Sequence, residues 1–168
     1  MFEKILIANR GEIAVRIIRA CKELNIKSVA IHSDVDNDAM HVRLADESIC
    51  VGSALPNNSY LNIPNIVSAI EITGADAVHP GYGFLSENDK FADILTKHDV
   101  KFIGPSPKSI LELGNKSNAL KLAHKHGLPI LGNENAKNIN NTKDAVKIAN
   151  DIGLPVVIKA AYGGGGKG

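Results

Sequence analysis

A glycine-rich run at residues 162–168 (YGGGGKG) is the segment of this sequence with the clearest capacity for chemistry. It follows an apolar stretch, residues 155–159 (PVVIK), that predicts a buried strand. Glycines have no Cβ, so their backbone N–H groups can approach an anion closely. Lys159 and Lys167 add positive charge on either side of the glycines. A strand, a glycine loop and two lysines in this order predict a phosphate-binding site.

This run differs from the common P-loop of nucleotide-binding enzymes. That loop requires a glycine, four further residues and then Gly-Lys-Ser/Thr. Counting back from Gly166 and Lys167 places Ala161 where the first glycine is needed, and Gly168 where the hydroxyl is needed. The sequence therefore predicts a phosphate loop of another kind, and a flexible tail or linker is the alternative interpretation.

A second glycine loop, residues 79–88 (HPGYGFLSEN), follows a predicted strand. Gly81 and Gly83 let the backbone come close to a ligand, and Tyr82 and Phe84 could flank a small flat one. In open sheets of parallel strands, ligands bind where the strands end. The residues alone make this loop a candidate ligand site.

The alternative interpretation of the same loop is a tight turn between strand and helix. Ser86 would then cap the next helix, and Asp89 would complete a pattern like a capping box. Residue chemistry favours neither interpretation. His79 is expected to make structural hydrogen bonds rather than bind a metal, since no partner ligand lies near it in sequence.

Other charged or glycine-containing segments carry weaker signals. The turn at residues 8–12 (ANRGE) contains a single glycine, Gly11, whereas a dinucleotide fingerprint needs three, so a nicotinamide enzyme is disfavoured even though Asp34 follows the second strand. Lys116 begins a predicted helix, where a solvated lysine is the default interpretation. Three charged residues spaced by three and four on another helix are typical of a solvated face or, less often, of a subunit contact; these are Arg16, Arg19 and Glu23.

Short apolar runs alternate with helical patterns along the first two thirds of the chain. Such alternation predicts an α/β fold with a doubly wound, mostly parallel sheet whose strand ends bind the ligand. In the first helix, the predicted buried face consists of Ile13, Ile17, Ala20, Cys21 and Leu24. Strands are expected at residues 4–8, 28–32, 48–51, 76–79 and 101–103, and helices at 12–24, 39–45, 63–73 and 87–97.

The pattern changes at Gly104 and Pro105, after which three helices are expected, at residues 106–113, 116–126 and 142–152. An asparagine-rich stretch before the last of these indicates a linker. We place a domain boundary near Gly114, which gives an N-terminal α/β domain at residues 1–114 and the beginning of a second domain at residues 115–168.

Composition excludes several classes of function. The chain has 168 residues, 44% hydrophobic and 22% charged, with a net charge of +1 and no tryptophan. Its charges are scattered and its aromatic residues few, so nucleic acid is not an expected partner. No apolar stretch approaches the roughly 20 residues that span a membrane, and no signal peptide opens the chain. Cys21 and Cys50 are expected to be buried free thiols, which suits a cytoplasmic protein.

Five segments together resemble the biotin carboxylase component of the biotin-dependent carboxylases: KILIANRGEIAVRIIRACKELNIKSVAIHS, HVRLADESICVG, SYLNIPNIVSAIEITGADAVHPGYGFLSEN, KFIGPSPKSI and PVVIKAAYGGGGKG. They span nearly the whole chain in the family's order. The SYLNIP segment before HPGYGFLSEN is more similar to the acetyl-CoA carboxylase subunit of fatty acid biosynthesis than to pyruvate, propionyl-CoA or methylcrotonyl-CoA carboxylases.

The resemblance implies an ATP-grasp ligase. This ligase would use ATP, Mg²⁺ and bicarbonate to carboxylate biotin on a biotin carboxyl carrier protein, as a homodimer working with carboxyltransferase subunits. The positions that match the family's functional residues fall into three groups. ATP is expected at Lys116, Lys159, Gly163, Gly164, Gly165 and Gly166; the biotin and carboxyphosphate side at Tyr82, Gly83 and Glu87; and the dimer contact at Arg16, Arg19 and Glu23.

The resemblance has one departure and one larger gap. The family usually has aspartate before the first lysine, where this chain has Asn115, and asparagine also caps helices well. The family's catalytic residues and magnesium ligands fall after Gly168, so no catalytic or metal-binding residue is expected within this chain. The 168 residues alone are therefore expected to be inactive.

Two alternatives to a truncated biotin carboxylase stay open. The chain could be a noncatalytic interaction module that keeps the fold, although a break inside a phosphate loop favours truncation. It could also belong to another ATP-grasp ligase, of purine biosynthesis or carbamoyl phosphate synthesis, although the HPGYGFLSEN segment favours a biotin enzyme.

Overall fold

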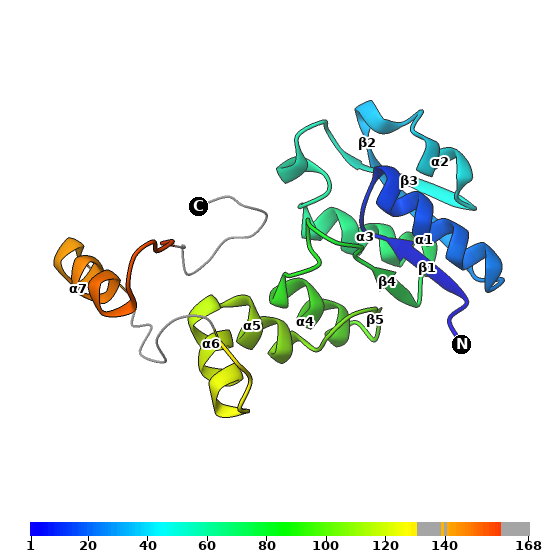
Figure 1. Ribbon diagram of the computed structural model, residues 1–168. Helices are drawn as coiled ribbons and strands as arrows, with labels where there is room; N and C mark the ends of the chain where they lie inside the picture. Colours follow the sequence, from blue (N-terminus) through cyan, green and yellow to red (C-terminus); the bar gives the residue numbers. More distant parts are fainter. Residues whose placement is uncertain (131–138, 140, 159–168) are drawn as a thin grey trace. The chain divides into compact units, whose positions relative to one another are not determined.

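The computed structural model describes residues 1–130, 139 and 141–158, and the chain divides into two compact units, residues 1–110 and residues 111–168. In the first unit, five strands form one sheet in the order β3-β2-β1-β4-β5, and every neighbouring pair is parallel (Figure 1). This confirms the predicted α/β class. The strands are β1 (Lys4–Ile7), β2 (Lys27–Ser33), β3 (Glu47–Gly52), β4 (Ala77–His79) and β5 (Lys101–Phe102).

Strand β1 lies at the centre of the sheet, between β2 and β4. Ile5 is in register with Ser28 on one side and with Ala77 on the other. The chain builds the sheet outward from β1 in one direction through β2 and β3, and in the other through β4 and β5. Strand order therefore reverses between β1 and β4, and the carboxyl ends of strands at such a reversal are where ligands bind in folds of this kind.

Helices cover both faces of the sheet because successive side chains of a strand point to opposite faces. Ile5 and Ile7 of β1 belong to the buried cluster that includes α1, whereas Leu6 belongs to the cluster that includes α3 and α4. Both layers can be followed in Figure 1. The helices of this unit are α1 (Gly11–Glu23), α2 (Met40–Leu44), α3 (Ile63–Thr73) and α4 (Asp89–Lys97), with short 3₁₀ turns η1 (Asp34–Asp36) and η2 (Pro56–Asn58).

The predicted buried face of α1 is confirmed at Cys21 and wrong at its other four residues. The residues that α1 buries are Ala14, Val15, Ile18 and Cys21. Apolar residues cover more than half of this helix, so their spacing alone allows two faces. The small Ala14 side chain lets the helix approach the sheet closely, and this choice leaves Ile13 and Ile17 half-buried and Ala20 and Leu24 exposed.

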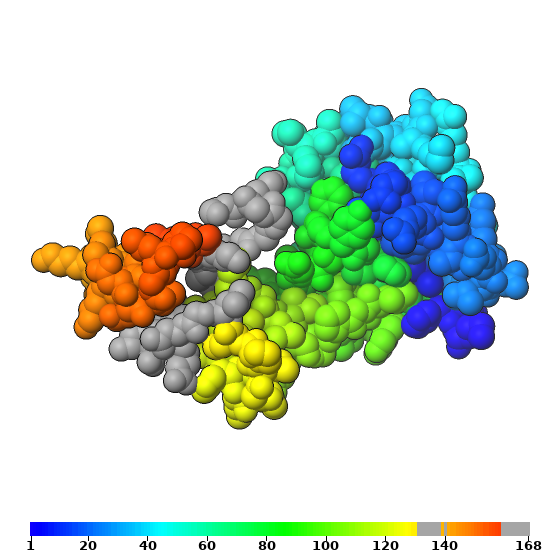
Figure 2. Space-filling view, in the orientation of Figure 1, coloured from blue at the N-terminus to red at the C-terminus, as the bar shows by residue number. Residues whose placement is uncertain are grey.

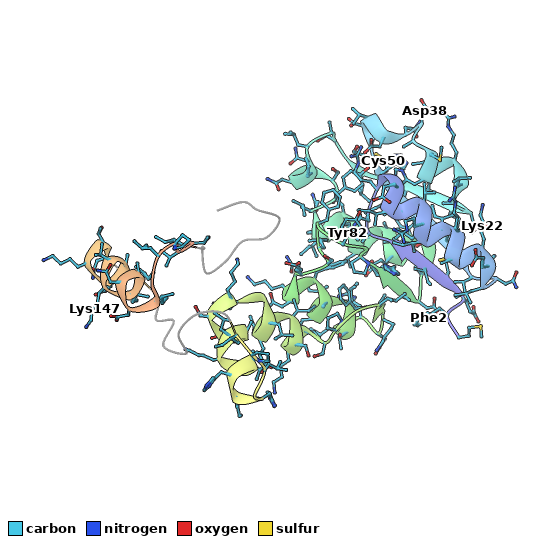
Figure 3. All side chains as sticks on the ribbon, in the orientation of Figure 1. Phe2, Lys22, Asp38, Cys50, Tyr82 and Lys147 are labelled. Carbon is cyan, nitrogen blue, oxygen red and sulfur yellow. The ribbon has the colours of Figure 1, made fainter. Side chains whose placement is uncertain are left out.

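Helix α3 and the two cysteines show where local signals succeed and where they fail. Helix α3 ends at Gly74, which adopts the left-handed conformation with φ +64, as predicted. Cys21 is buried as expected, but Cys50 is exposed, and Figure 3 labels it. Strand β3 is an edge strand on which Ser48 and Cys50 point to an uncovered face.

In the second unit, the described residues form helices without a buried interior. Helix α5 (Pro107–Gly114) begins in the first unit, where Ile110 joins the core, and α6 (Lys116–Lys125) and α7 (Thr142–Ile152) contain no buried residue. Residues 155–158 of the predicted last strand are not in a strand, which corrects that prediction. A parallel strand needs a neighbour for its hydrogen bonds, and the described part of this unit contains no other strand.

Within residues 1–130 and 141–158, no helix has both the length and the apolar character that crossing a membrane requires.

Candidate functional site

The loop at residues 80–84 follows β4 at the point where strand order reverses. Gly81 and Gly83 have φ values of +63 and +71, and Phe84 has φ +41. Glycine adopts such values freely, whereas a phenylalanine there costs roughly 1–3 kcal/mol and persists only where surrounding contacts impose it. The loop is therefore held in one conformation by its neighbours.

Tyr82 is the most exposed aromatic side chain of this loop, with 61% of its surface accessible. Its Oη donates a hydrogen bond of 2.6 Å to Oε1 of Glu12, at the start of α1. This bond raises the pKa of the Tyr82 phenol above its ordinary value, because ionising the phenol would break it. Figure 3 labels Tyr82, and in Figure 2 the green atoms of this region lie against the blue atoms of the N-terminal segment. Two of the predicted substrate-side residues, Tyr82 and Gly83, thus lie in one exposed loop.

Glu87, the third predicted substrate-side residue, is exposed in the turn that leads from this loop into α4. The cap of α4 is not the one expected from sequence. Asn88 caps the helix, its Oδ1 accepting from the Phe91 backbone N–H at 2.8 Å. Ser86 lies two residues too early, and its N–H instead donates to the carbonyl of Gly83 at 2.9 Å.

His79 makes the structural hydrogen bond that the sequence predicted. Its Nδ1 accepts from the backbone N–H of Gly81 at 3.0 Å. Burial lowers the pKa of His79 and so favours the neutral ring, whose unprotonated nitrogen accepts this bond. Among the described residues, no group of three or more His, Cys, Asp or Glu side chains is arranged to hold a metal ion.

An ionic cluster beside the loop was not predicted. Arg10 donates through Nε and Nη2 to the two carboxylate oxygens of Asp36, at 2.7 and 2.5 Å. Tyr60 donates from Oη to Asp36 Oδ2 at 2.5 Å, and the same Oη accepts from the Ser33 N–H at 3.0 Å. The Arg10 guanidinium holds the pKa of Asp36 well below its usual range, so the carboxylate stays charged.

This cluster supports the loop through aromatic packing. The Tyr60 ring stacks on Phe84 with centroids 5.3 Å apart and an angle of 22° between the ring planes. The guanidinium carbon of Arg10 lies 5.7 Å from the centre of the Tyr60 ring. Burial, and then the bond to Asp36, raise the pKa of Tyr60, so its phenol remains a donor. Arg10, Asp36 and Tyr60 therefore belong to the candidate site.

The sequence contains a signal that could have identified this cluster. Asn9 and Arg10 come just after β1, and Ser33 and Asp36 come at the end of β2 or just after it. Neighbouring parallel strands end at the same edge of the sheet, so polar residues that follow them are candidates for contact. Tyr60 carries no such signal, because a long connection from β3 brings it to this edge.

Of the residues predicted to bind the nucleotide, only Lys116 lies within the described part of the chain. Lys116 is the first residue of α6 in the second unit, half-buried, directly after the cap Asn115, whose Oδ1 accepts from the Asn118 N–H at 3.1 Å. A lysine beside a helix N-terminus suits a phosphate group, because the positive end of the helix dipole and the ammonium both attract anions. Lys159 and the predicted loop glycines, Gly163, Gly164, Gly165 and Gly166, lie outside the described residues.

The predicted dimer residues Arg16, Arg19 and Glu23 are all exposed on α1. Their spacing of three and four residues places them on one stripe of the helix, away from the buried Ala14 and Ile18. The arrangement offers a charged surface that a second protein could contact.

A separate hollow of about 420 Å³ lies along β5. Its lining shares no residue with the loop at 80–84. The lining residues come from the end of α4, from β5 and from the segment after it; they are Thr96, Asp99, Val100, Lys101, Phe102, Gly104, Pro105, Ser106 and Pro107.

Comparisons with known proteins match both parts of the chain. The family model described as biotin carboxylase, N-terminal domain, matches residues 1–110, and the one described as carbamoyl-phosphate synthase L chain, ATP binding domain, matches residues 115–168. The biotin carboxylase of Haemophilus influenzae is 53% identical over 168 residues, which cover 100% of this chain and 38% of that protein. The human mitochondrial propionyl-CoA carboxylase alpha chain is 53% identical over 167 residues, or 99% of this chain and 23% of that protein.

Solved structures agree in fold. The biotin carboxylase domain dimer of the Hydrogenobacter thermophilus 2-oxoglutarate carboxylase, in complex with MgADP, ADP and bicarbonate, superposes with a TM-score of 0.93 at 43% identity. The similarity covers 99% of this chain and 36% of that one. The chain thus spans little more than a third of the length of the two biotin carboxylases and less than a quarter of the propionyl-CoA carboxylase alpha chain.

Proposed function

Because this chain belongs to the family of the biotin carboxylase N-terminal domain, we propose that it is part of an ATP-dependent ligase that carboxylates biotin on a carrier protein, using bicarbonate. In this proposal, residues 1–114 form the N-terminal α/β domain and residues 115–168 begin the ATP-grasp domain.

One observation carries the proposal. The alignment to a bacterial biotin carboxylase, at 53% identity, spans all 168 residues, so the loop at 80–84, Lys116 and the glycine-rich run all lie within the aligned range. Similarity limited to the parallel sheet would support the fold alone, since unrelated functions share such sheets. Similarity that continues through all three of these candidate ligand segments supports the function as well.

ATP is proposed to bind at Lys116, Lys159 and the run from Gly163 through Gly166. ATP would supply the phosphoryl group that activates bicarbonate, and Mg²⁺ would accompany it. The lysines of this chain would offset negative charge on the phosphates, and the glycine N–H groups would approach the phosphate oxygens without steric hindrance. The position of Lys116 at the N-terminus of α6 fits this role.

Biotin and carboxyphosphate are proposed to meet the chain at Tyr82, Gly83 and Glu87. These residues belong to an exposed loop and turn at the sheet edge where ligands of parallel sheets bind. The Tyr82–Glu12 bond would keep the aromatic ring in place for a flat ligand. The stripe Arg16, Arg19 and Glu23 is proposed to contact a second copy of the protein.

The wider setting is proposed to be a cytoplasmic acetyl-CoA carboxylase of fatty acid biosynthesis, with a biotin carboxyl carrier protein and carboxyltransferase subunits as partners. Equal identity to a bacterial biotin carboxylase and to a propionyl-CoA carboxylase chain does not separate the acyl-CoA classes. The SYLNIP segment at residues 59–64 is what favours acetyl-CoA.

The test is ATP cleavage by the protein expressed from the complete gene. We expect phosphate release that requires bicarbonate and rises when free biotin is added. The Lys116→Gln variant should raise the KM for ATP by about tenfold or more, because a charged contact to phosphate is lost. The 168-residue chain by itself is expected to release no phosphate. Cleavage that ignores both bicarbonate and biotin would contradict the proposal.

A further inference from the structure

Asn9 is completely buried two residues after β1, and both polar atoms of its carboxamide have backbone partners. Nδ2 donates to the carbonyl of Pro80 at 2.8 Å and to the carbonyl of Tyr82 at 2.9 Å, while Oδ1 accepts from the Arg10 N–H at 2.9 Å. An asparagine has two N–H donors, so both are committed to the loop. Turning the amide over would set Oδ1 against two carbonyl oxygens, so these partners also define its orientation.

Gly81 lies between the two carbonyls that Asn9 binds, and it rests directly on the Asn9 side chain. A Cβ at this position would come within 2.6 Å of Ile13 Cγ2 and 2.8 Å of Asn9 Nδ2, and the φ of +63 disfavours any other residue. The glycine therefore allows the loop to descend far enough for both carbonyls to reach the carboxamide.

Two further contacts from the same turn reach the same loop. Glu12 accepts a hydrogen bond from Tyr82 Oη. Arg10 donates to Asp36, Asp36 accepts from the Tyr60 hydroxyl, and the Tyr60 ring stacks on Phe84. Residues 9–12 thus hold the loop at its beginning, its middle and its end. Because Phe84 has a strained backbone, the loop needs such external contacts to stay in this conformation.

We propose that Asn9 is a positioning residue that holds the loop at residues 80–84 in the conformation that presents Tyr82 and Gly83 to the ligand. The identity of that ligand as biotin rests on the proposed function. Asn9 acts through the loop backbone and does not itself meet the ligand. Among side chains of this size only asparagine offers two donors from one atom, since an ionised aspartate has none and serine has a single O–H.

The test compares Asn9→Asp with Asn65→Asp in the full-length protein. Asn65 makes a bond of the same chemistry, from Nδ2 to the Val51 carbonyl at 2.8 Å, away from the loop. In Asn9→Asp we expect amide hydrogen exchange in residues 81–84 to rise about tenfold or more, since two hydrogen bonds are lost. The KM for biotin should rise by about tenfold while the KM for ATP changes less than about twofold. Asn65→Asp should change neither loop exchange nor the KM for biotin.

Unchanged loop exchange in a folded Asn9→Asp protein would overturn the proposal, as would equal rises in the KM values for biotin and ATP. If Asn9→Asp does not fold, the unsubstituted protein decides the question. Its ¹⁵N-labelled Asn9 carboxamide protons should exchange at least about tenfold more slowly than those of exposed asparagines such as Asn57, and fast exchange contradicts the proposal.

The two proposals fail in different ways. If the unsubstituted protein does not respond to biotin, the proposed function is wrong, while the exchange measurement still tests the role of Asn9. If the protein responds to biotin and Asn9→Asp behaves like Asn65→Asp, the proposed function stands and the positioning role is wrong.

Discussion

In residues 1–110, helices α1, α3 and α4 each bury a complete face against the sheet, whereas α6 and α7 in residues 111–168 bury no residue. The helices of both units have similar local signals: α3 and α4 are capped by Asn62 and Asn88, and α6 and α7 by Asn115 and Asn141. Local sequence therefore specifies a helix in either unit. A core requires strands that meet from distant parts of the chain, and only the first unit has them among the described residues.

The largest expected difference between the units concerns leucine side chains. Leu95 in α4 is 1% exposed and Leu154 is 75% exposed. In the 168-residue chain, Leu95→Ala should lower the free energy of unfolding by about 2–5 kcal/mol, because it removes buried contacts and leaves a cavity. Leu154→Ala should change it by less than about 0.5 kcal/mol. Urea unfolding followed by circular dichroism measures both, and equal losses would show that the units do not differ in this way.

Glycine-to-alanine substitutions should change stability in opposite directions in the two units. A Cβ on Gly52, where φ is +143, would lie 1.8 Å from the Asn58 carbonyl oxygen, so Gly52→Ala should destabilise the protein by about 1–3 kcal/mol or more. Gly114, at the end of α5, has no atom within 4 Å of its added Cβ. Gly114→Ala should stabilise helix α5 by about 0.4–1 kcal/mol, because alanine loses less backbone entropy. The thermal midpoints of the two variants test this, and a lower midpoint for Gly114→Ala would contradict it.

Removing a helix cap should cost about 1 kcal/mol in either unit, but its effect should spread differently. Asn88 accepts from the Phe91 N–H at 2.8 Å, and Phe91 lies in the core, so Asn88→Ala should lower the unfolding midpoint of the whole first unit. Asn141 accepts from the Asp144 N–H at 2.9 Å in a helix with no buried residue. Asn141→Ala should reduce helix signal without moving the midpoint of the first unit, and a shift of that midpoint would disprove the distinction.

The first unit should also lose stability gradually between pH 7.5 and 5.5. Burial lowers the pKa of His41 and of His79, and the Nδ1 of His41 is buried without a hydrogen-bond partner among the described residues. In the unfolded chain both rings titrate near their ordinary pKa of about 6.5. As the pH falls through that value, the unfolded state binds more protons than the folded state, so folding becomes less favourable.

His41→Gln removes one of these two groups and should reduce the slope of stability against pH. The carboxylate of Asp36 does not contribute in this window, because its pKa is lowered and its stabilisation is lost only below about pH 4. Thr73→Val removes a buried hydroxyl that donates to the Ala69 carbonyl at 2.7 Å, yet it cannot titrate. Thr73→Val should lower the thermal unfolding midpoint by the same amount at pH 7.5 and at pH 5.5. If His41→Gln leaves the slope of stability against pH unchanged, His41 is not a cause of the pH dependence.

Most of the architecture of the first unit could be predicted from sequence, because each strand is a short apolar run and α3 ends at a glycine. The predictions for α1 and Cys50 were wrong because the local sequence is compatible with more than one pattern of burial. Helix α1 has apolar residues on more than half of its circumference, so only the sheet decides that Ala14 and Ile18 are buried. Cys50 is apolar in a strand pattern, but its exposure depends on β3 being an edge strand.

The candidate site was less predictable than the fold. Tyr82 and Gly83 could be named as candidates from the composition of their own segment. Asn9 was not, because its role depends on carbonyls 71 and 73 residues away in the chain. Every residue has a backbone carbonyl, so the sequence does not indicate which carbonyl a distant side chain will bind. Such a pair can be identified only from the folded structure. The same holds for Tyr60, whose contacts with Asp36 and Phe84 cross three separate segments.

The position of β1 in the middle of the sheet has a consequence for the synthesis of this protein. On the ribosome, β1 is translated well before β4. Ile5 therefore cannot pair on that side until Ala77, its partner in β4, has been made. At ordinary elongation rates the roughly 70 residues between them take about 4 to 14 seconds to translate. Both edges of β1 are unpaired until β2 is made, and the edge toward β4 then stays unpaired until β4 follows, a surface to which other nascent chains can add. We therefore expect the nascent chain to depend on a chaperone that covers β1 during this interval.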